Sequence, residues 1–110
     1  MKGTNLGEFE ELVLLTIAAL MNDAYSVGIC DELSKHTGRK VRLGVIHAVL
    51  NRLEVKGLLK SQLGDATKIR GGKRKRYYSL TNGGKAALIR ANDIRQQLWK
   101  RIPEIAFGKI

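Results

Sequence analysis

The sequence predicts a mainly α, α+β fold in which three helices are followed by a two-stranded β-hairpin and a long C-terminal helix. Three observations support this prediction. Apolar residues recur at spacings of three and four in four segments, and two β-prone segments flank a stretch rich in Gly and Lys. The length of 110 residues is enough for one core and too short for two ordinary domains.

The first helix is predicted over residues 8–21, where no Gly or Pro interrupts the chain. Its first turn holds Glu8, Glu10 and Glu11, and acidic side chains there oppose the positive end of the helix dipole. The second half is apolar almost all round, which indicates packing on more than one side. One stripe is expected to face the core of this chain: Phe9, Val13, Ile17 and Leu20. The adjacent Leu14 and Ala18 are left to meet another element or a second subunit, and we assign them to the second subunit.

Two shorter helices follow. Ser26 is expected to cap the second helix, which Gly38 ends, and residues 39–43 form a β-tolerant connection. The inward residues of the second helix are Ile29, Cys30 and Leu33. The third helix is predicted over residues 44–56, before a left-handed Gly57. Its buried stripe is Ile46, Val49, Leu50 and Leu53.

The hairpin is predicted from two β-prone segments, residues 58–63 and 75–80, in which Tyr77 and Tyr78 should face opposite sides of the strand. The segment that follows can be interpreted in two ways, because the Asn-Gly pair at 82–83 is typical of a hairpin turn while Thr81 is also a good helix N-cap. The apolar residues after it repeat with a helical period, which predicts a helix from Asn82 to about Arg101. The helical stripe consists of Ala87, Ala91, Ile94, Leu98 and Ile102.

Charge is divided unevenly along the chain. Residues 1–34 carry a formal charge of −5 and residues 35–110 carry +15, for a total of +10. This division indicates a polyanionic partner that binds one face. Three helices followed by a hairpin define a winged helix-turn-helix, in which one helix fits the major groove of duplex DNA while the basic hairpin reaches the neighbouring backbone or the minor groove.

The chain also resembles a known family. The segments GVIHAVLNRLEVKGLLKS and RGGKRKRYYSLTNGGKAAL, together with LGEFEELVLLTIAAL and AYSVGICDEL, are similar to the PadR family of bacterial transcriptional regulators over residues 6–90. The resemblance is to the compact subgroup with a single C-terminal dimerisation helix. It implies a homodimeric, sequence-specific DNA-binding regulator, expected to be a repressor. It also implies that a small hydrophobic or aromatic effector binds near Trp99. Packing of Trp99 in the dimer interface is an equal alternative.

These arguments assign residues 1–80 to DNA binding and residues 81–110 to dimerisation within one structural domain. The expected DNA contacts come from the third helix and its approach, and from the hairpin: Lys40, Arg42, Gly44, His47, Asn51, Arg52, Lys73, Arg74, Lys75 and Arg76. An ion pair between Arg52 and Glu54 is the alternative for that arginine. The expected dimer contacts are Leu14, Ala18, Ala91, Ile94, Leu98 and Ile102.

Where the family usually has Tyr and often Pro, this chain has His47 and Ala48, and Arg42 to Gly44 replace a common Ser-Pro-Gly. These departures motivate an alternative, a ligand sensor or protein-interaction adaptor without specific DNA reading. An RNA-binding module is a third possibility, without a matching signature of stacking aromatics.

Catalytic and membrane functions find no support in the motifs. Two His residues and one Cys provide no metal-ligand spacing and no nucleophile with its base, so no enzyme activity, metal or cofactor is expected. Cys30 alone excludes an internal disulfide. The apolar stretch of residues 12–21 follows acidic rather than basic residues and is too short for a membrane span, which predicts a cytoplasmic protein.

Overall fold

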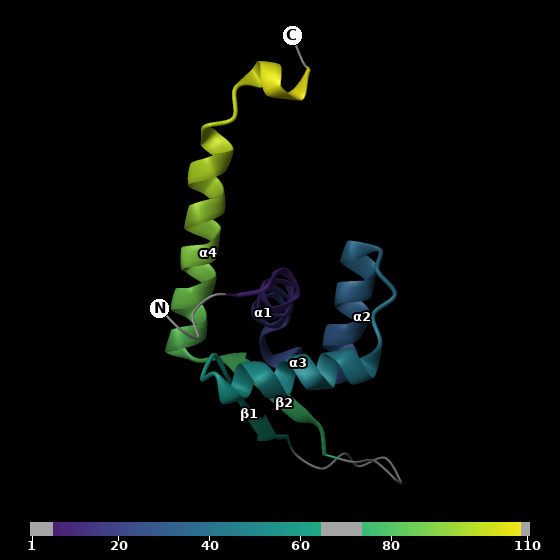
Figure 1. The fold of residues 1–110 in the computed structure, drawn as a ribbon. Helices are drawn as coiled ribbons and strands as arrows, with labels where there is room; N and C mark the ends of the chain where they lie inside the picture. The colour runs from purple at the N-terminus through teal and green to yellow at the C-terminus, as the bar shows by residue number, and fades with distance from the viewer. Residues whose placement is uncertain (1–5, 65–73, 109–110) are drawn as a thin grey trace.

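A computed structural model describes residues 6–64 and 74–108 and confirms the predicted winged-helix arrangement (Figure 1). The described elements are, in chain order, α1 (Glu8–Leu20), the 3-10 turn η1 (Met21–Asp23), α2 (Ser26–Thr37), α3 (Leu43–Val55), β1 (Leu59–Leu63), β2 (Arg76–Leu80), α4 (Asn82–Lys100) and the 3-10 turn η2 (Glu104–Phe107). The helix boundaries agree with the predicted ones to within one residue. The connection at residues 38–42 forms no strand.

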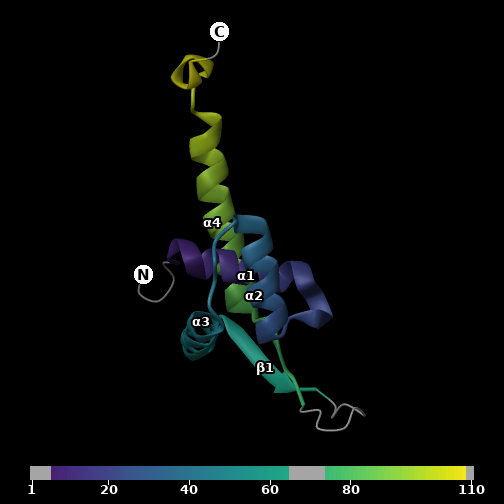
Figure 2. The same cartoon turned by 90° about the vertical axis from the view of Figure 1, so that its right-hand side faces the viewer.

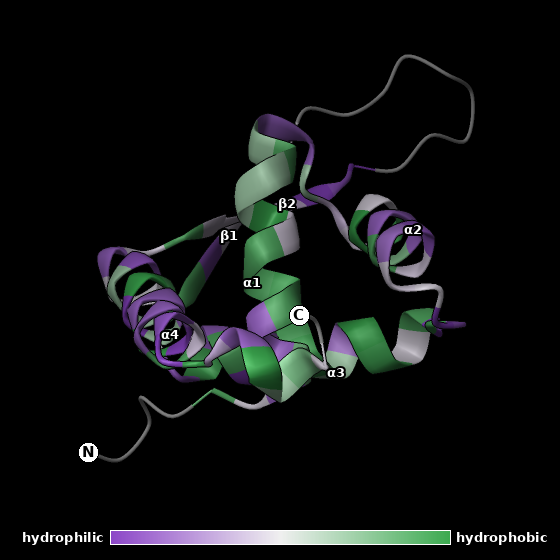
Figure 3. Ribbon diagram, turned by 90° about the horizontal axis from the view of Figure 1, so that it is seen from above, coloured by the Kyte–Doolittle hydropathy of each residue, from purple (hydrophilic) through white to green (hydrophobic). Residues whose placement is uncertain are grey.

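Helix α1 is the centre of the fold. Figure 3 shows it as a largely hydrophobic helix between α2 and α4, and it also packs against α3 and β2. The buried cluster draws on all three N-terminal helices and on the start of β1: Val13, Leu14, Ile17, Ala24, Ile29, Cys30, Leu33, Ile46, Val49, Leu50, Leu53, Leu58 and Leu59. From α4 only Ala87 and Leu88 pack against this cluster, and both are only partly buried.

The prediction for Leu14 was wrong. Leu14 is fully buried in the core of its own chain and is therefore unavailable to a second subunit. Because this half of α1 is apolar on nearly every side, the sequence alone did not separate inward from outward positions. The exposed apolar positions on α1 are Leu15, Ala18 and Ala19.

The glycines predicted to end α2 and α3 are confirmed, whereas the predicted N-cap of α2 is not. Gly38 and Gly57 adopt positive φ angles of 71° and 80°, in the left-handed region where glycine is the favoured residue. Ser26 is already the first residue of α2, and Tyr25 holds the N-cap position without a side-chain hydrogen bond. Tyr25 is extended because it forms an isolated β-bridge with Tyr77.

The hairpin pairs β1 with β2 in antiparallel register, from Leu59 opposite Leu80 to Leu63 opposite Arg76. The two tyrosines of β2 face opposite sides, as predicted. Tyr78 packs on the core, whereas Tyr77 lies edge-on against Tyr25 at a centroid distance of 5.9 Å. The outward tyrosine is therefore half-buried at the base of the hairpin.

Helix α4 begins at the predicted N-cap. The Thr81 hydroxyl accepts a hydrogen bond from the Gly84 amide at 3.0 Å and donates one to the Gly57 carbonyl at 2.6 Å. Gly84 lies so close to the Leu58 carbonyl that a Cβ atom would collide with it. The start of α4 is thus fixed against the end of α3.

The remainder of α4 projects away from the other helices, on the side opposite the hairpin (Figure 2). The radius of gyration is 16.7 Å, whereas a compact chain of this length has about 13 Å. Every residue from 92 to 108 is exposed. Several large apolar side chains are among them: Ile94, Leu98, Trp99, Ile102, Ile105 and Phe107.

Candidate nucleic-acid interface

The outward face of α3 is exposed along its whole length, as the sequence predicted. Gly44, His47 and Asn51 are all exposed, with Val45 and Ala48 between them. Among the described residues, and apart from its chain neighbours and its own helix backbone, no atom lies within 4 Å of the position where a Cβ on Gly44 would stand, so the start of the helix is open to a close approach. The only acidic residue of α3 is Glu54, near its other end.

The approach to α3 adds positive charge to this face. Lys40 and Arg42 are exposed on either side of Val41 and line a shallow groove with Phe9 and Val45. Arg42 holds the N-cap position of α3, and no acidic residue lies in the first turn. The two cations and the open helix start give this end of α3 a positive potential, which favours a phosphate group.

Arg52 has a partner that the sequence did not suggest. Its Nε donates to Glu10 Oε2 at 3.0 Å, and Lys56 Nζ lies 2.9 Å from the same oxygen. The ion-pair alternative with Glu54 was wrong because α1 brings Glu10 closer to this side of α3. Whether Arg52 also contacts DNA stays a prediction, since its side chain remains half exposed.

Glu10 is the buried partner in this cluster, with a side chain only 8% exposed. Burial by itself raises the pKa of the carboxyl, but hydrogen bonds from Lys56, the Gly7 amide and Arg52 outweigh it and lower the pKa to about 2. Glu10 is therefore charged at neutral pH and holds the end of α3 against the start of α1.

Glu54 is engaged by the hairpin. Its Oε2 accepts a hydrogen bond from Ser61 Oγ at 2.8 Å, and Arg76 Nη1 donates to the same hydroxyl at 3.1 Å. This chain of contacts links α3 to both strands. It also places positive charge beside the acidic residue of the helix.

The hairpin carries the remaining predicted contacts. Arg74 and Arg76 are exposed at the end of β2 nearest the tip, and Arg74 Nε donates to the Gly64 carbonyl at 2.7 Å. Lys75 Nζ lies 4.1 Å from the centre of the Tyr25 ring, a cation–π contact within the chain. Lys73 lies outside the described residues.

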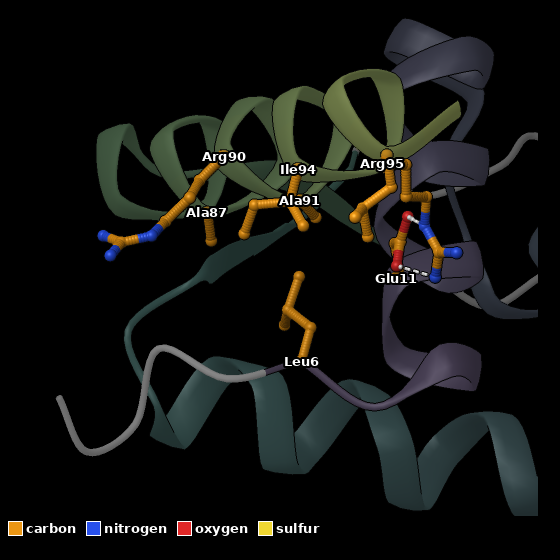
Figure 4. A pocket seen from close by; sticks show the side chains of 8 residues that line it. Leu6, Glu11, Ala87, Arg90, Ala91, Ile94 and Arg95 are labelled. Carbon is orange, nitrogen blue, oxygen red and sulfur yellow. Dashed lines mark hydrogen bonds and ion pairs between the residues drawn. The ribbon is translucent and has the colours of Figure 1, made fainter. Parts of the chain in front are cut away.

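Three predicted dimer residues of α4, Ala91, Ile94 and Leu98, line an open groove beside α1 together with Ala87, and Ile102 lies at a second groove further along the helix. Figure 4 shows Ala87, Ala91 and Ile94 pointing toward Leu6, with Arg95 paired to Glu11 at the side. The groove has a volume of about 390 Å³. Ala18 lies on a different surface, in a groove with Met21, Lys60 and Leu80 at the other end of α1.

Trp99 lies further along α4 and is 64% exposed. It lines a second groove with Arg95, Leu98 and Ile102, and its ring centre is 6.0 Å from that of Phe107. Phe107 belongs to η2, so the chain after Pro103 brings a second aromatic ring beside the indole, in a tilted arrangement. Phe107 could not be predicted from the sequence, because no helical period connects it to the stripe of α4.

The described part of the chain holds no group of three or more His, Cys, Asp or Glu that could bind a metal ion. Cys30 is buried and its Sγ donates to the Val41 carbonyl at 3.3 Å. Burial and the neighbouring Asp31 raise the pKa of this thiol, so it has the character of a structural residue. Over residues 6–64 and 74–108, no helix is long and apolar enough to cross a membrane.

Comparison with known proteins agrees with this geometry. Residues 13–90 match the PadR-like family of transcriptional regulators. An uncharacterized protein of Lysinibacillus sphaericus is 36% identical over 84 residues, which cover 74% of this chain and 72% of the relative.

Two solved structures illustrate the similarity in fold. A PadR-like transcriptional regulator from Bacillus cereus superposes with a TM-score of 0.72 at 22% identity, covering 92% of this chain and 93% of that one. A PadR family transcription regulator from Clostridium difficile R20291 gives 0.60 at 27% identity, covering 84% and 88%.

An exposed helix with a positive approach, beside a basic hairpin on a three-helix core, defines a winged-helix DNA-binding protein. The chain belongs to the PadR-like family, and it is a DNA-binding transcriptional regulator rather than an enzyme.

Proposed function

We propose that the protein is a homodimeric repressor that binds a two-fold related duplex site through α3 and the hairpin of each subunit. Residues 1–80 bind DNA in this proposal, and residues 81–110 join the subunits. The observation that carries the proposal is the exposed face of α3, where Gly44, His47 and Asn51 are open and Lys40 and Arg42 supply charge at one end. The two α3 helices would enter successive major grooves about 34 Å apart.

The surface of α4 supports the dimer. Ile94, Leu98 and Ile102 follow one stripe of the helix and are exposed in the single chain, although each has a large apolar side chain. Apolar groups of this size are stabilised when a second surface removes them from water, at about 25 cal/mol for each Å². A second copy of α4 carries the same stripe, so pairing of the two helices would remove the apolar side chains of both chains from water.

Repression is the proposed mode because a dimer that occupies DNA excludes other proteins from an overlapping site without further contacts. Phosphate contacts would supply most of the affinity, and the outward side chains of α3 would discriminate between sequences. The cytoplasm is the compartment that such a function requires.

The test begins with selection of bound DNA from random duplexes, followed by affinity measurements from 50 to 200 mM salt. The double variant Arg74→Ala with Arg76→Ala should weaken binding to all sequences alike. It should also reduce the slope of log affinity against log salt by about 2, if each arginine neutralises one phosphate.

Lys100→Ala with Arg101→Ala is the matched control, because it removes the same charge at the far end of α4. An equal loss in both double variants would indicate a general charge effect and contradict binding through the hairpin. Failure of the parent protein to select any duplex would favour a sensor or adaptor without specific DNA reading.

We also propose that a small hydrophobic or aromatic effector binds beside Trp99. The groove there is lined by Leu98, Trp99 and Ile102, and Trp99 is largely exposed. Titration with flat aromatic compounds should quench the tryptophan fluorescence, and a bound effector should change the DNA affinity by the same factor by which DNA changes the effector affinity. No response to any member of a hydrophobic and phenolic panel would contradict a site there.

A further inference from the structure

Besides the partly buried packing of Ala87 and Leu88, two further contacts hold α4 against the DNA-binding head, by which we mean α1, α2, α3 and the hairpin. The first is at the start of α4, where Thr81 bonds to Gly57 and Gly84 packs against Leu58. A single contact of this kind fixes the position of a helix end, but it leaves the direction of the helix free to change.

The second contact is an ion pair between α1 and α4. Arg95 Nε donates to Glu11 Oε2 at 2.9 Å, and Arg95 Nη2 donates to Glu11 Oε1 at 2.8 Å (Figure 4). This side-on geometry, with two parallel hydrogen bonds, restricts orientation more than a single contact does. The Glu11 side chain is only 12% exposed, although Arg95 is largely exposed.

The spacing of the two contacts along the helix makes the ion pair decisive. Arg95 is eleven residues after Gly84, which corresponds to about 16 Å along the axis. Between them Ala87 and Leu88 pack against the core, both only partly buried, and the next residues toward α1, Ala91 and Ile94, line an open groove. Packing therefore holds the first two turns of α4 but not the turn that carries Arg95, and all the residues from 92 to 108 are exposed.

We propose that Glu11 and Arg95 are positioning residues that set the tilt of α4 and thereby the separation of the two α3 helices. This inference rests on the proposed function, since it requires a dimer joined through α4. Each head is attached to the dimer by its own α4, so a change in tilt moves both α3 helices relative to one another. The ion pair thus selects the spacing of the two DNA half-sites.

The first test measures spacing preference. The parent protein should bind one half-site spacing at least about fivefold more tightly than spacings one base pair shorter or longer, a ratio typical of a modest coupling. Glu11→Ala should bring this ratio close to one, with affinity for an isolated half-site unchanged. The charge exchange Glu11→Arg with Arg95→Glu should restore the preference.

Glu8→Ala is the matched control. Glu8 lies in the same turn of α1 and also pairs with an arginine, Arg39, at 2.7 Å. That pair joins the start of α1 to the approach of α3, whereas both hydrogen bonds from the Arg95 guanidinium described above go to Glu11, and the Glu8 charge acts on Arg95 only through space. Glu8→Ala should therefore keep the spacing ratio, even if half-site affinity changes. A parent-like spacing ratio in Glu11→Ala, or an equal loss in Glu8→Ala, would overturn the proposal.

The second test does not require DNA. Spin labels on Val55→Cys and Gln97→Cys, in a Cys30→Ala background diluted with unlabelled protein, report the distance between α3 and α4 within one chain. The distribution should be narrow in the parent and broader in Glu11→Ala.

These two tests separate the possible failures. If the parent selects no half-site spacing, the proposed function is wrong, and the distance measurement decides the role of the ion pair alone. If the distance distribution is the same in parent and variant, the ion pair does not set the tilt, whatever the DNA result.

Discussion

Replacing Glu10 by Gln tests how α3, the helix proposed to enter the major groove, is held in place. The Gln amide keeps the shape of the side chain and can still accept a hydrogen bond from the Gly7 amide. It removes the negative charge that faces Arg52 and Lys56 from within the core. We expect a folded but clearly less stable protein, with weaker DNA binding because the end of α3 is no longer fixed to α1.

The magnitude follows from the pKa of Glu10. A fall from 4.5 to about 2 at a side chain 8% exposed corresponds to about 3 kcal/mol, since each pKa unit is worth about 1.4 kcal/mol. For a chain of this size, that loss would lower the midpoint of thermal unfolding by roughly 10–20 °C.

The pH dependence has a defined sign. Because the folded pKa lies below the unfolded one, the charge of Glu10 contributes its full stabilisation above about pH 4.5, and this contribution is lost as the pH falls toward 2. The difference in unfolding free energy between parent and Glu10→Gln should therefore be largest near pH 7. It should shrink steadily between pH 4.5 and 2.

Urea unfolding at fixed protein concentration, followed by circular dichroism at several pH values, measures this difference. Glu8→Gln is the control, because its pair with Arg39 is exposed and should contribute at most about 1 kcal/mol. The reasoning would be refuted if Glu10→Gln unfolded at the parent's urea midpoint at pH 7. A difference that stayed constant down to pH 2 would contradict the electrostatic origin.

Two further predictions concern α4. Gly84→Ala should cost about 1–3 kcal/mol of unfolding free energy in urea, because the new methyl group would collide with the Leu58 carbonyl, whereas Gly83→Ala has ordinary clearance and should be neutral or stabilising. A Gly84→Ala protein as stable as the parent would mean that this helix end shifts freely. Leu98→Lys should keep the fold but weaken dimer formation at least tenfold in sedimentation experiments, because Leu98 is 62% exposed in the single chain and a lysine would place charge in the apolar interface. Gln97→Lys adds the same charge off the stripe, and an equal loss of dimer in both variants would contradict an interface on that face.

Local patterns were sufficient to predict most of the fold. The spacing of Ile46, Val49, Leu50 and Leu53 fixed the inward face of α3, and the same positions are buried in the structure. Thr81 was recognised as an N-cap because the helical period continued after it. These features depend on residues close together in the chain, where periodicity and turn chemistry act directly.

The contacts that organise the candidate site are of a different kind. Glu10 meets Arg52 and Lys56 across 42 and 46 residues, and Glu11 meets Arg95 across 84. Glutamates in the first turn of a helix are explained locally by the helix dipole, so no pattern in the sequence indicates distant partners for them. Ser26 failed as a cap for a similar reason, since a strand bridge to Tyr77 determines the backbone at Tyr25.

The burial pattern of α4 has a consequence for engineering. Among residues 6–64 and 74–108, none after Leu88 belongs to the core, even as a partly buried residue, so the outer half of the helix contributes little to the stability of the head. A different self-associating helix could therefore be grafted after Arg95 without refolding the rest of the chain. Such chimaeras would keep the DNA-binding surface formed by α3 and the hairpin. The grafted helix would then determine how many copies of the chain assemble, independently of the DNA sequence that is bound.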